Sequence, residues 1–144
     1  MSHSIQEILE YAHTVAVVGA SKDASKPSGK IPYLLKHRGF RIIPVNPNAE
    51  DVLGEHTYAS LLDIREPVDV VDVFRPAAEA PAIARQAVAI GAKALWLQLG
   101  IVSDEARSIA EAAGLDYVED LCMGRESMRL HIAQSPKVRL SRQA

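Results

Sequence analysis

Residues 14–47 read TVAVVGASKDASKPSGKIPYLLKHRGFRIIPVNP, and their pattern predicts the architecture of the chain. The apolar run at 15–18 is typical of a buried strand and passes into the small residues Gly19, Ala20 and Ser21. A loop rich in Lys and Ser follows, then a short helix and a second apolar strand that ends before Asn46. This order is that of the first βαβ unit of a nucleotide-binding α/β domain, in which turn N–H groups and a helix N-terminus meet a phosphate.

Acidic residues are missing from the part of this segment where a dinucleotide fold would need one. Dinucleotide-binding domains place an Asp or Glu about 20 residues past the glycine turn, where it binds the ribose. Residues 24–49 contain no Asp or Glu, but they contain the basic side chains Lys26, Lys30, Lys36, Arg38 and Arg41. We therefore expect a phosphate-rich nucleotide other than NAD.

Strands and helices alternate along the rest of the chain. Largely apolar runs, which are typical of parallel strands buried on both faces, occur at residues 15–18, 42–45, 68–74, 94–99 and 115–118, the third of them broken by Asp69 and Asp72. Helical spacing predicts helices around 5–12, 80–88 and 106–113, and Gly39, Gly91 and Gly114 stand where helices end. The pattern predicts an α/β protein with a single doubly wound, mostly parallel sheet and a ligand crevice at the carboxyl ends of its strands.

The composition is that of one ordinary globular domain. The 144 residues are 48% hydrophobic and 24% charged, with a formal net charge of −2, which argues against a nucleic-acid or membrane-surface binder. No apolar run approaches a membrane span, and the single Cys122 excludes an internal disulfide, so we expect a cytoplasmic protein. We assign residues 1–133 to the domain and expect the basic residues 134–144 to form a poorly ordered tail.

The glycine loop offers the groups that bind phosphate. Gly19 permits a tight turn, and the hydroxyls of Ser21 and Ser28 can donate to phosphate oxygens. We expect Ser28 or Gly29 to open a helix over 30–38, with Pro32 in its first turn and Lys26 and Lys30 adding positive charge. An ordinary solvated loop would carry similar residues, but its place between two buried strands favours phosphate binding.

Other strand ends should lie along the same edge of the sheet. Proline at 44 and 47 stiffens the backbone around Asn46, so that Asn46 and Pro47 suit a wall for adenine or ribose, although they equally suit a strand-ending turn. Arg75, between Phe74 and Pro76, could meet a phosphate through both arms of its guanidinium. The same edge continues at Gln98 and at the Glu119 to Cys122 loop.

No spacing of residues defines a catalytic or metal site. The five histidines share no motif with a nucleophile or carboxylate, and Asp69, Asp72, Glu119 and Asp120 are predicted at strand ends without an acid–base pattern. Cys122 precedes a helix expected near Gly124, so it is either a small buried hydrophobe or a thiol at the ligand edge. We name no catalytic residue and leave open whether the protein is an enzyme.

The sequence resembles a known family, the small stand-alone CoA-binding proteins. The resemblance covers about residues 5–132 and is carried by the motifs VAVVGAS at 15–21, PVNP at 44–47, LG at 53–54, YASL at 58–61, VFRP at 73–76 and LWLQLG at 95–100. Those proteins are Rossmann-like domains similar to the CoA-binding domain of succinyl-CoA synthetase α chains and of NDP-forming acyl-CoA synthetases. No single motif is specific, but their conjunction is.

The resemblance implies that coenzyme A or an acyl-CoA lies across the first loop. Its diphosphate would lie near Gly19, Ala20 and Ser21, its adenosine near Asn46 and Pro47, and more of the ligand near residues 74–76. The phosphohistidine domain of the related ligases has no counterpart in a chain of this length, so the resemblance supplies no reaction. An NAD(P)-dependent oxidoreductase, or another nucleotide-binding enzyme, on the same fold is the alternative. The acyl form, the process served and the formation of a homo-oligomer stay open.

Overall fold

Five parallel strands make one sheet in the part of the chain that the computed structural model describes, residues 2–48 and 50–134. The strands are β1 (Thr14–Val18), β2 (Arg41–Val45), β3 (Val70–Val73), β4 (Ala94–Leu97) and β5 (Asp116–Val118). They are arranged in the order β2-β1-β3-β4-β5. The order reverses direction between β1 and β3, which is the switch point where α/β sheets of this kind open a crevice.

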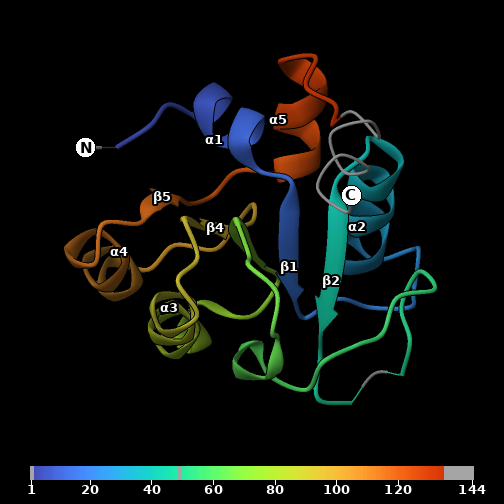
Figure 1. Ribbon diagram of the computed structural model, residues 1–144, viewed down its shortest axis with the longest axis horizontal. Helices are drawn as coiled ribbons and strands as arrows, with labels where there is room; N and C mark the ends of the chain where they lie inside the picture. The colour runs from blue at the N-terminus through green and yellow to red at the C-terminus, as the bar shows by residue number, and fades with distance from the viewer. Residues whose placement is uncertain (1, 49, 135–144) are drawn as a thin grey trace.

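Helices cover both faces of the sheet, which makes the fold Rossmann-like and α/β, as the sequence predicts (Figure 1). The helices are α1 (Ile5–Tyr11), α2 (Pro27–His37), α3 (Ala80–Ala89), α4 (Asp104–Ala112) and α5 (Met123–Arg129). Two short 3-10 turns, η1 (Leu61–Asp63) and η2 (Ala77–Glu79), follow β2 and β3. Helices α3 and α4 lie on one face, and α1, α2 and α5 lie on the other.

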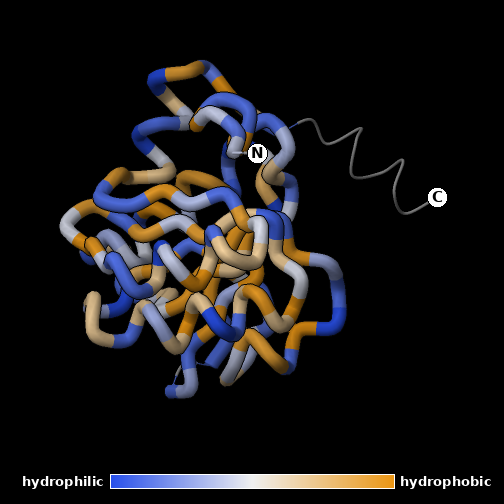
Figure 2. The backbone as a smooth tube through the Cα atoms, turned by 90° about the vertical axis from the view of Figure 1, so that its left-hand side faces the viewer, coloured by the Kyte–Doolittle hydropathy of each residue, from blue (hydrophilic) through white to orange (hydrophobic). Residues whose placement is uncertain are grey.

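The core divides between the two faces because successive residues of a strand point in opposite directions. In β1, Ala16 packs on the α3–α4 side, whereas Val15 and Val17 pack on the side of α1, α2 and α5. Trp96 is fully buried on this second side. Figure 2 shows the hydrophobic segments running through the interior of the molecule.

Local signals predict several boundaries correctly. Ser4 and Glu7 form the capping box expected at the start of α1, with each backbone N–H donating to the other side chain. Gly39, Gly91 and Gly114 all have positive φ after helices, as expected of C-terminal caps.

Several predicted boundaries are wrong, among them the strand predicted at 68–74, which spans only Val70–Val73. Helix α2 begins at Pro27, three residues before the predicted start at 30, so Pro32 lies inside the helix rather than in its first turn. Proline is well suited to the first position of a helix because its fixed φ matches and its missing N–H is not needed there. Strand β4 ends at Leu97 rather than 99, since the chain turns at Gly100, where φ is +86°. The predicted tail falls almost wholly on residues 135–144, outside the described residues.

Candidate ligand-binding crevice

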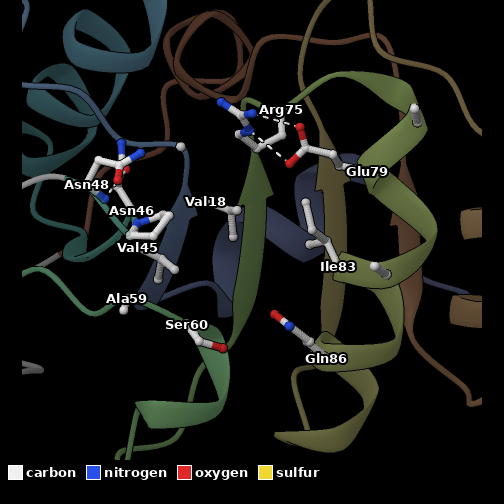
Figure 3. A pocket seen from close by; sticks show the side chains of 14 residues that line it. Val18, Val45, Asn46, Asn48, Ala59, Ser60, Arg75, Glu79, Ile83 and Gln86 are labelled. Atoms are coloured by element: carbon white, nitrogen blue, oxygen red, sulfur yellow. Dashed lines mark hydrogen bonds and ion pairs between the residues drawn. The ribbon is translucent and has the colours of Figure 1, made fainter.

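A cavity of about 500 Å³ opens at the carboxyl ends of β1, β2 and β3 (Figure 3). Its walls come from the ends of these strands, from the residues before η1 and from the first turns of α3. Residues predicted from the sequence that line it are Gly19, Asn46, Pro47 and Arg75. The cavity therefore lies at the switch point between β1 and β3, where ligands of doubly wound sheets bind.

Both the backbone conformation at position 19 and the atoms around it require a glycine. Its φ is +89°, and a Cβ atom here would lie 2.9 Å from Cδ of Arg75 and 3.0 Å from the carbonyl oxygen of Phe74. Its N–H donates to the carbonyl of Val45 over 2.8 Å. The glycine thus lets the stem of Arg75 cross the end of β1 at close range.

Asn46 ties the loop after β2 to the loop after β1. Its Nδ2 donates to the carbonyl oxygen of Ala20 over 3.0 Å, and its Oδ1 accepts the N–H of Asn48 over 3.0 Å. The side chain that the sequence offers as a ligand donor and acceptor is therefore also a brace between two walls of the cavity.

The loop from Ser21 to Lys26 folds back on the first turn of α2. The N–H of Ser21 donates to the carbonyl of Ser28 over 3.0 Å, and a Cβ at Gly29 would lie 2.2 Å from the carbonyl oxygen of Asp23. Gly29 is thus buried by close approach of the loop, while Ser28 is half-buried and Lys26 and Lys30 are exposed. The two exposed lysines lie at the N-cap and near the start of α2, next to this loop.

Arg75 is already paired on the rim of the cavity. Its Nε donates to Oε1 of Glu79 over 3.1 Å and its Nη2 to Oε2 over 2.7 Å, as the dashed lines in Figure 3 show. The hydrogen bonds from Arg75 hold the pKa of the Glu79 carboxyl below its usual range. The sequence pattern did not single out Glu79, because the acid of a dinucleotide site is expected only after β2. The four-residue spacing from Arg75, which suits an ion pair on a helical turn, was the available signal.

Asp72 lies inside β3 and is fully buried, so its predicted place at a strand end is wrong. Nε2 of Gln98 donates to its Oδ1 over 2.7 Å, while Oδ2 has no hydrogen-bond partner among the described residues. Burial raises the pKa of this carboxyl to about 7, and the hydrogen bond from Gln98 offsets only part of that effect. Gln98 is 4% exposed, so its predicted contact with a ligand stays a prediction.

The residues at positions 13–128 match the family described as the CoA binding domain. This chain belongs to that family. The CoA-binding domain is 34% identical to the uncharacterized protein YneT of Bacillus subtilis over 83% of this chain and 88% of that protein. It is 37% identical to an ADP-forming acetate–CoA ligase of Archaeoglobus fulgidus over 72% of this chain, but it spans only 16% of that ligase.

Solved structures agree with the fold. The CoA-binding domain superposes on a protein from Thermus thermophilus with a TM-score of 0.84 and 40% identity, over 89% of this chain and 99% of the other. The likeness therefore extends over nearly all of both proteins.

The remaining predicted residues are not among those that line the cavity. Phe74 is partly buried against the core on the α2 side, and Pro76 precedes η2. Cys122 is half-buried and precedes α5, next to Leu121, whose carbonyl accepts Nε1–H of Trp96 over 2.8 Å.

Neither a metal cluster nor a membrane-spanning helix occurs in the described part of the CoA-binding domain. Residues 2–48 and 50–134 contain no group of three or more His, Cys, Asp or Glu side chains that could hold a metal ion. None of the helices in these ranges has both the length and the apolar character that crossing a membrane requires.

Proposed function

We propose that this protein binds coenzyme A or an acyl-CoA in the crevice at the ends of β1, β2 and β3. The observation that carries the proposal is a cavity of about 500 Å³ at the switch point, walled by Gly19 and Arg75, in a member of the CoA-binding domain family. A cavity of this volume is in the range of small-molecule sites.

The proposed pose follows the chemistry of the walls. The diphosphate lies over Gly19, Ala20 and Ser21, where glycine permits close approach and Lys26 and Lys30 can add charge. Ser28 and Gly29 shape the base of this loop. The adenosine lies against Asn46 and Pro47, and a phosphate group is within reach of Arg75, between Phe74 and Pro76.

The pantetheine arm then runs along the strand ends toward Gln98 and Cys122. Residues 1–133 make the binding domain. We propose binding without catalysis, because no arrangement of the described side chains in the crevice assigns an acid, a base or a nucleophile.

Calorimetric titration with CoA, NAD and NADP tests the proposal. The titration includes NAD because Glu79 places a carboxylate in the cavity wall. Dinucleotide sites use a carboxylate to bind the ribose hydroxyls of NAD. We expect CoA to bind with micromolar-range affinity or better and to raise the melting temperature, as a ligand selective for the folded state must. A melting curve that responds to NAD or NADP but not to saturating CoA would overturn the proposal.

Two variants test the location of the site. Arg75→Ala should weaken CoA binding by about 1 to 3 kcal/mol with little loss of stability, since Arg75 is half exposed. Ser21→Asp should weaken it further by placing a carboxylate beside the diphosphate. The matched control is Arg85→Ala on α3, an exposed arginine that is not part of the cavity wall. Unchanged affinity in both site variants would exclude this crevice.

A further inference from the structure

The cavity wall carries two charged side chains of opposite sign among its described residues, Arg75 and Glu79. The rest of the wall is apolar or neutral. Because the two charges form an ion pair with each other, the wall has little net charge to attract a phosphate.

The geometry of the pair limits what Arg75 can do for a ligand. Glu79 occupies Nε and Nη2, which together form one of the two edges through which a guanidinium binds an oxyanion bidentately. The stem of Arg75 lies against Gly19, so this occupied guanidinium is held beside the backbone that would approach a phosphate. Glu79 does not lie behind the arginine as a purely orienting carboxylate would, because it lines the cavity itself (Figure 3).

We propose that Glu79 competes with a phosphate group of the bound ligand for Arg75, so that Glu79 is a residue that weakens and tunes binding at this crevice. The inference rests on the proposed function, because it takes CoA or a related phosphate ester as the ligand. A carboxylate and a phosphate both bind guanidinium edges, and Glu79 holds one of the two, so Arg75 offers its Nε–Nη2 edge to a phosphate only by giving up Glu79. A carboxylate left on the wall also repels a nearby phosphate.

The side chains of Arg75 and Glu79 are both half exposed, and this exposure limits how much their pairing can weaken phosphate binding. Exposed ion pairs are worth little, because water and side-chain entropy offset most of the attraction. Releasing Arg75 from Glu79 should therefore tighten phosphate binding by about two- to fivefold, rather than by orders of magnitude.

The test is calorimetric titration of the full chain and of Glu79→Gln with CoA and with dephospho-CoA. We expect Glu79→Gln to bind CoA about two- to fivefold more tightly than the original protein. A gain for CoA alone assigns Arg75 to the ribose phosphate, and an equal gain for dephospho-CoA assigns it to the diphosphate. Weaker or unchanged CoA binding by Glu79→Gln would overturn the inference.

Two further variants distinguish competition for Arg75 from a general effect of charge. Glu105→Gln also removes one exposed carboxylate from an ion pair, with Arg85, at a place outside the cavity wall, and it should leave the affinity unchanged. In an Arg75→Gln background, adding Glu79→Gln should give no gain, because the competition needs the guanidinium. A gain of the same size in that background, or in Glu105→Gln, would show that Glu79 acts by general charge and would overturn the inference.

The outcomes separate this inference from the proposed function. If the original protein binds CoA and Glu79→Gln gives no gain, the competition is wrong and the CoA site stands. If neither protein binds CoA or dephospho-CoA, both are wrong. Melting curves of each variant without ligand check that the fold is unchanged.

Discussion

At the amino ends of the strands, Asp69 and Asp116 are buried and every carboxylate oxygen has a partner, whereas in the carboxyl half of the sheet the Arg75–Glu79 pair is half exposed and Asp72 has an oxygen without a partner among the described residues. Oδ2 of Asp69 accepts the N–H groups of His13 and Thr14 over 3.0 and 2.9 Å, and Nζ of Lys93 lies 3.2 Å from Oδ1. Asp116 accepts the N–H of His3 and the hydroxyl of Tyr11, each over 2.8 Å.

The carboxyl half of the sheet differs in each respect. The Arg75–Glu79 pair beyond β3 is open to solvent, and Asp72, buried inside β3, has one oxygen without a partner among the described residues. The pKa values of the buried carboxyls Asp116 and Asp72 move in opposite directions. Burial alone would raise the pKa of Asp116, but the hydrogen bonds from His3 and Tyr11 outweigh it and lower that pKa, whereas burial dominates at Asp72 and raises its pKa.

The polar groups at the two ends of the sheet therefore have different roles. Polar groups at the amino edge join α1 to the strands and stabilise the fold. In the carboxyl half, Arg75 and Glu79 line the cavity, and the buried Asp72 keeps one oxygen that no described residue bonds. Substitutions at the first edge should therefore change stability, and substitutions at the second should change binding or pH dependence.

Among these variants, Asp69→Ala should cause the largest loss of stability. It leaves the N–H groups of His13 and Thr14 without their acceptor, so the free energy of unfolding should fall by roughly 3 kcal/mol. Denaturant unfolding measures this loss, and CoA affinity per folded molecule should not change. Asp63→Ala, at an exposed position in η1, is the control. A loss at Asp69 no larger than that of the control would contradict the assignment.

Asp72→Asn should act in the opposite direction and depend on pH. The folded state holds the Asp72 proton up to a pKa of about 7, while an unfolded Asp loses it near 3.8. This group's stabilising contribution is therefore complete below pH 3.8, declines as the pH rises, and is lost above pH 7.

The variant avoids the buried charge, so at about pH 8 it should be more stable than the original protein by about 2 kcal/mol, with a much smaller difference at about pH 5. Denaturant unfolding of both proteins at the two pH values measures the effect. Equal differences at both pH values would show that Asp72 does not titrate in this range.

Gly19→Ala should link stability and binding at the carboxyl edge. The alanine is strained at φ +89° and meets Arg75 and the carbonyl of Phe74, so we expect a loss of about 1 to 2 kcal/mol in stability and weaker CoA binding. Gly91→Ala is a matched control, because its φ is +73° but its Cβ meets nothing within 4 Å. The control should lose stability alone. If CoA affinity falls equally in both variants, the close contact at Gly19 is not what matters.

Cys122 should show the smallest effect, a slow exchange with oxidised CoA. The Cys122 thiolate attacks the disulfide of oxidised CoA, forms a mixed disulfide and releases one CoA thiolate. Intact-protein mass spectrometry should detect one CoA per chain, reversed by reductant and absent in Cys122→Ser. Failure of the adduct to form, under conditions where CoA binds, would place Cys122 out of reach and assign it to packing.

The arrangement of strands and helices could be predicted from local patterns. The apolar runs of the strands, the capping box of Ser4 and Glu7, and the glycines after the helices each act within a few residues. Such signals survive in the sequence, so the βαβ opening and the position of Gly19 at its turn were predictable. The start of α2 was not, because two residues, Pro27 and Pro32, could each occupy a first turn.

The contacts of Asn46 with Ala20 and of Asp72 with Gln98 were decided by tertiary structure alone. These contacts join residues from different strands and loops, and their energies depend on distances that no local pattern records. The pairing of Arg75 with Glu79 follows a local four-residue spacing, but the entry of Glu79 into the cavity depends on how the chain turns through η2 after β3. The sequence therefore predicts which edge of the sheet carries the proposed ligand site, while the packing of the strand ends determines which charges that edge leaves free.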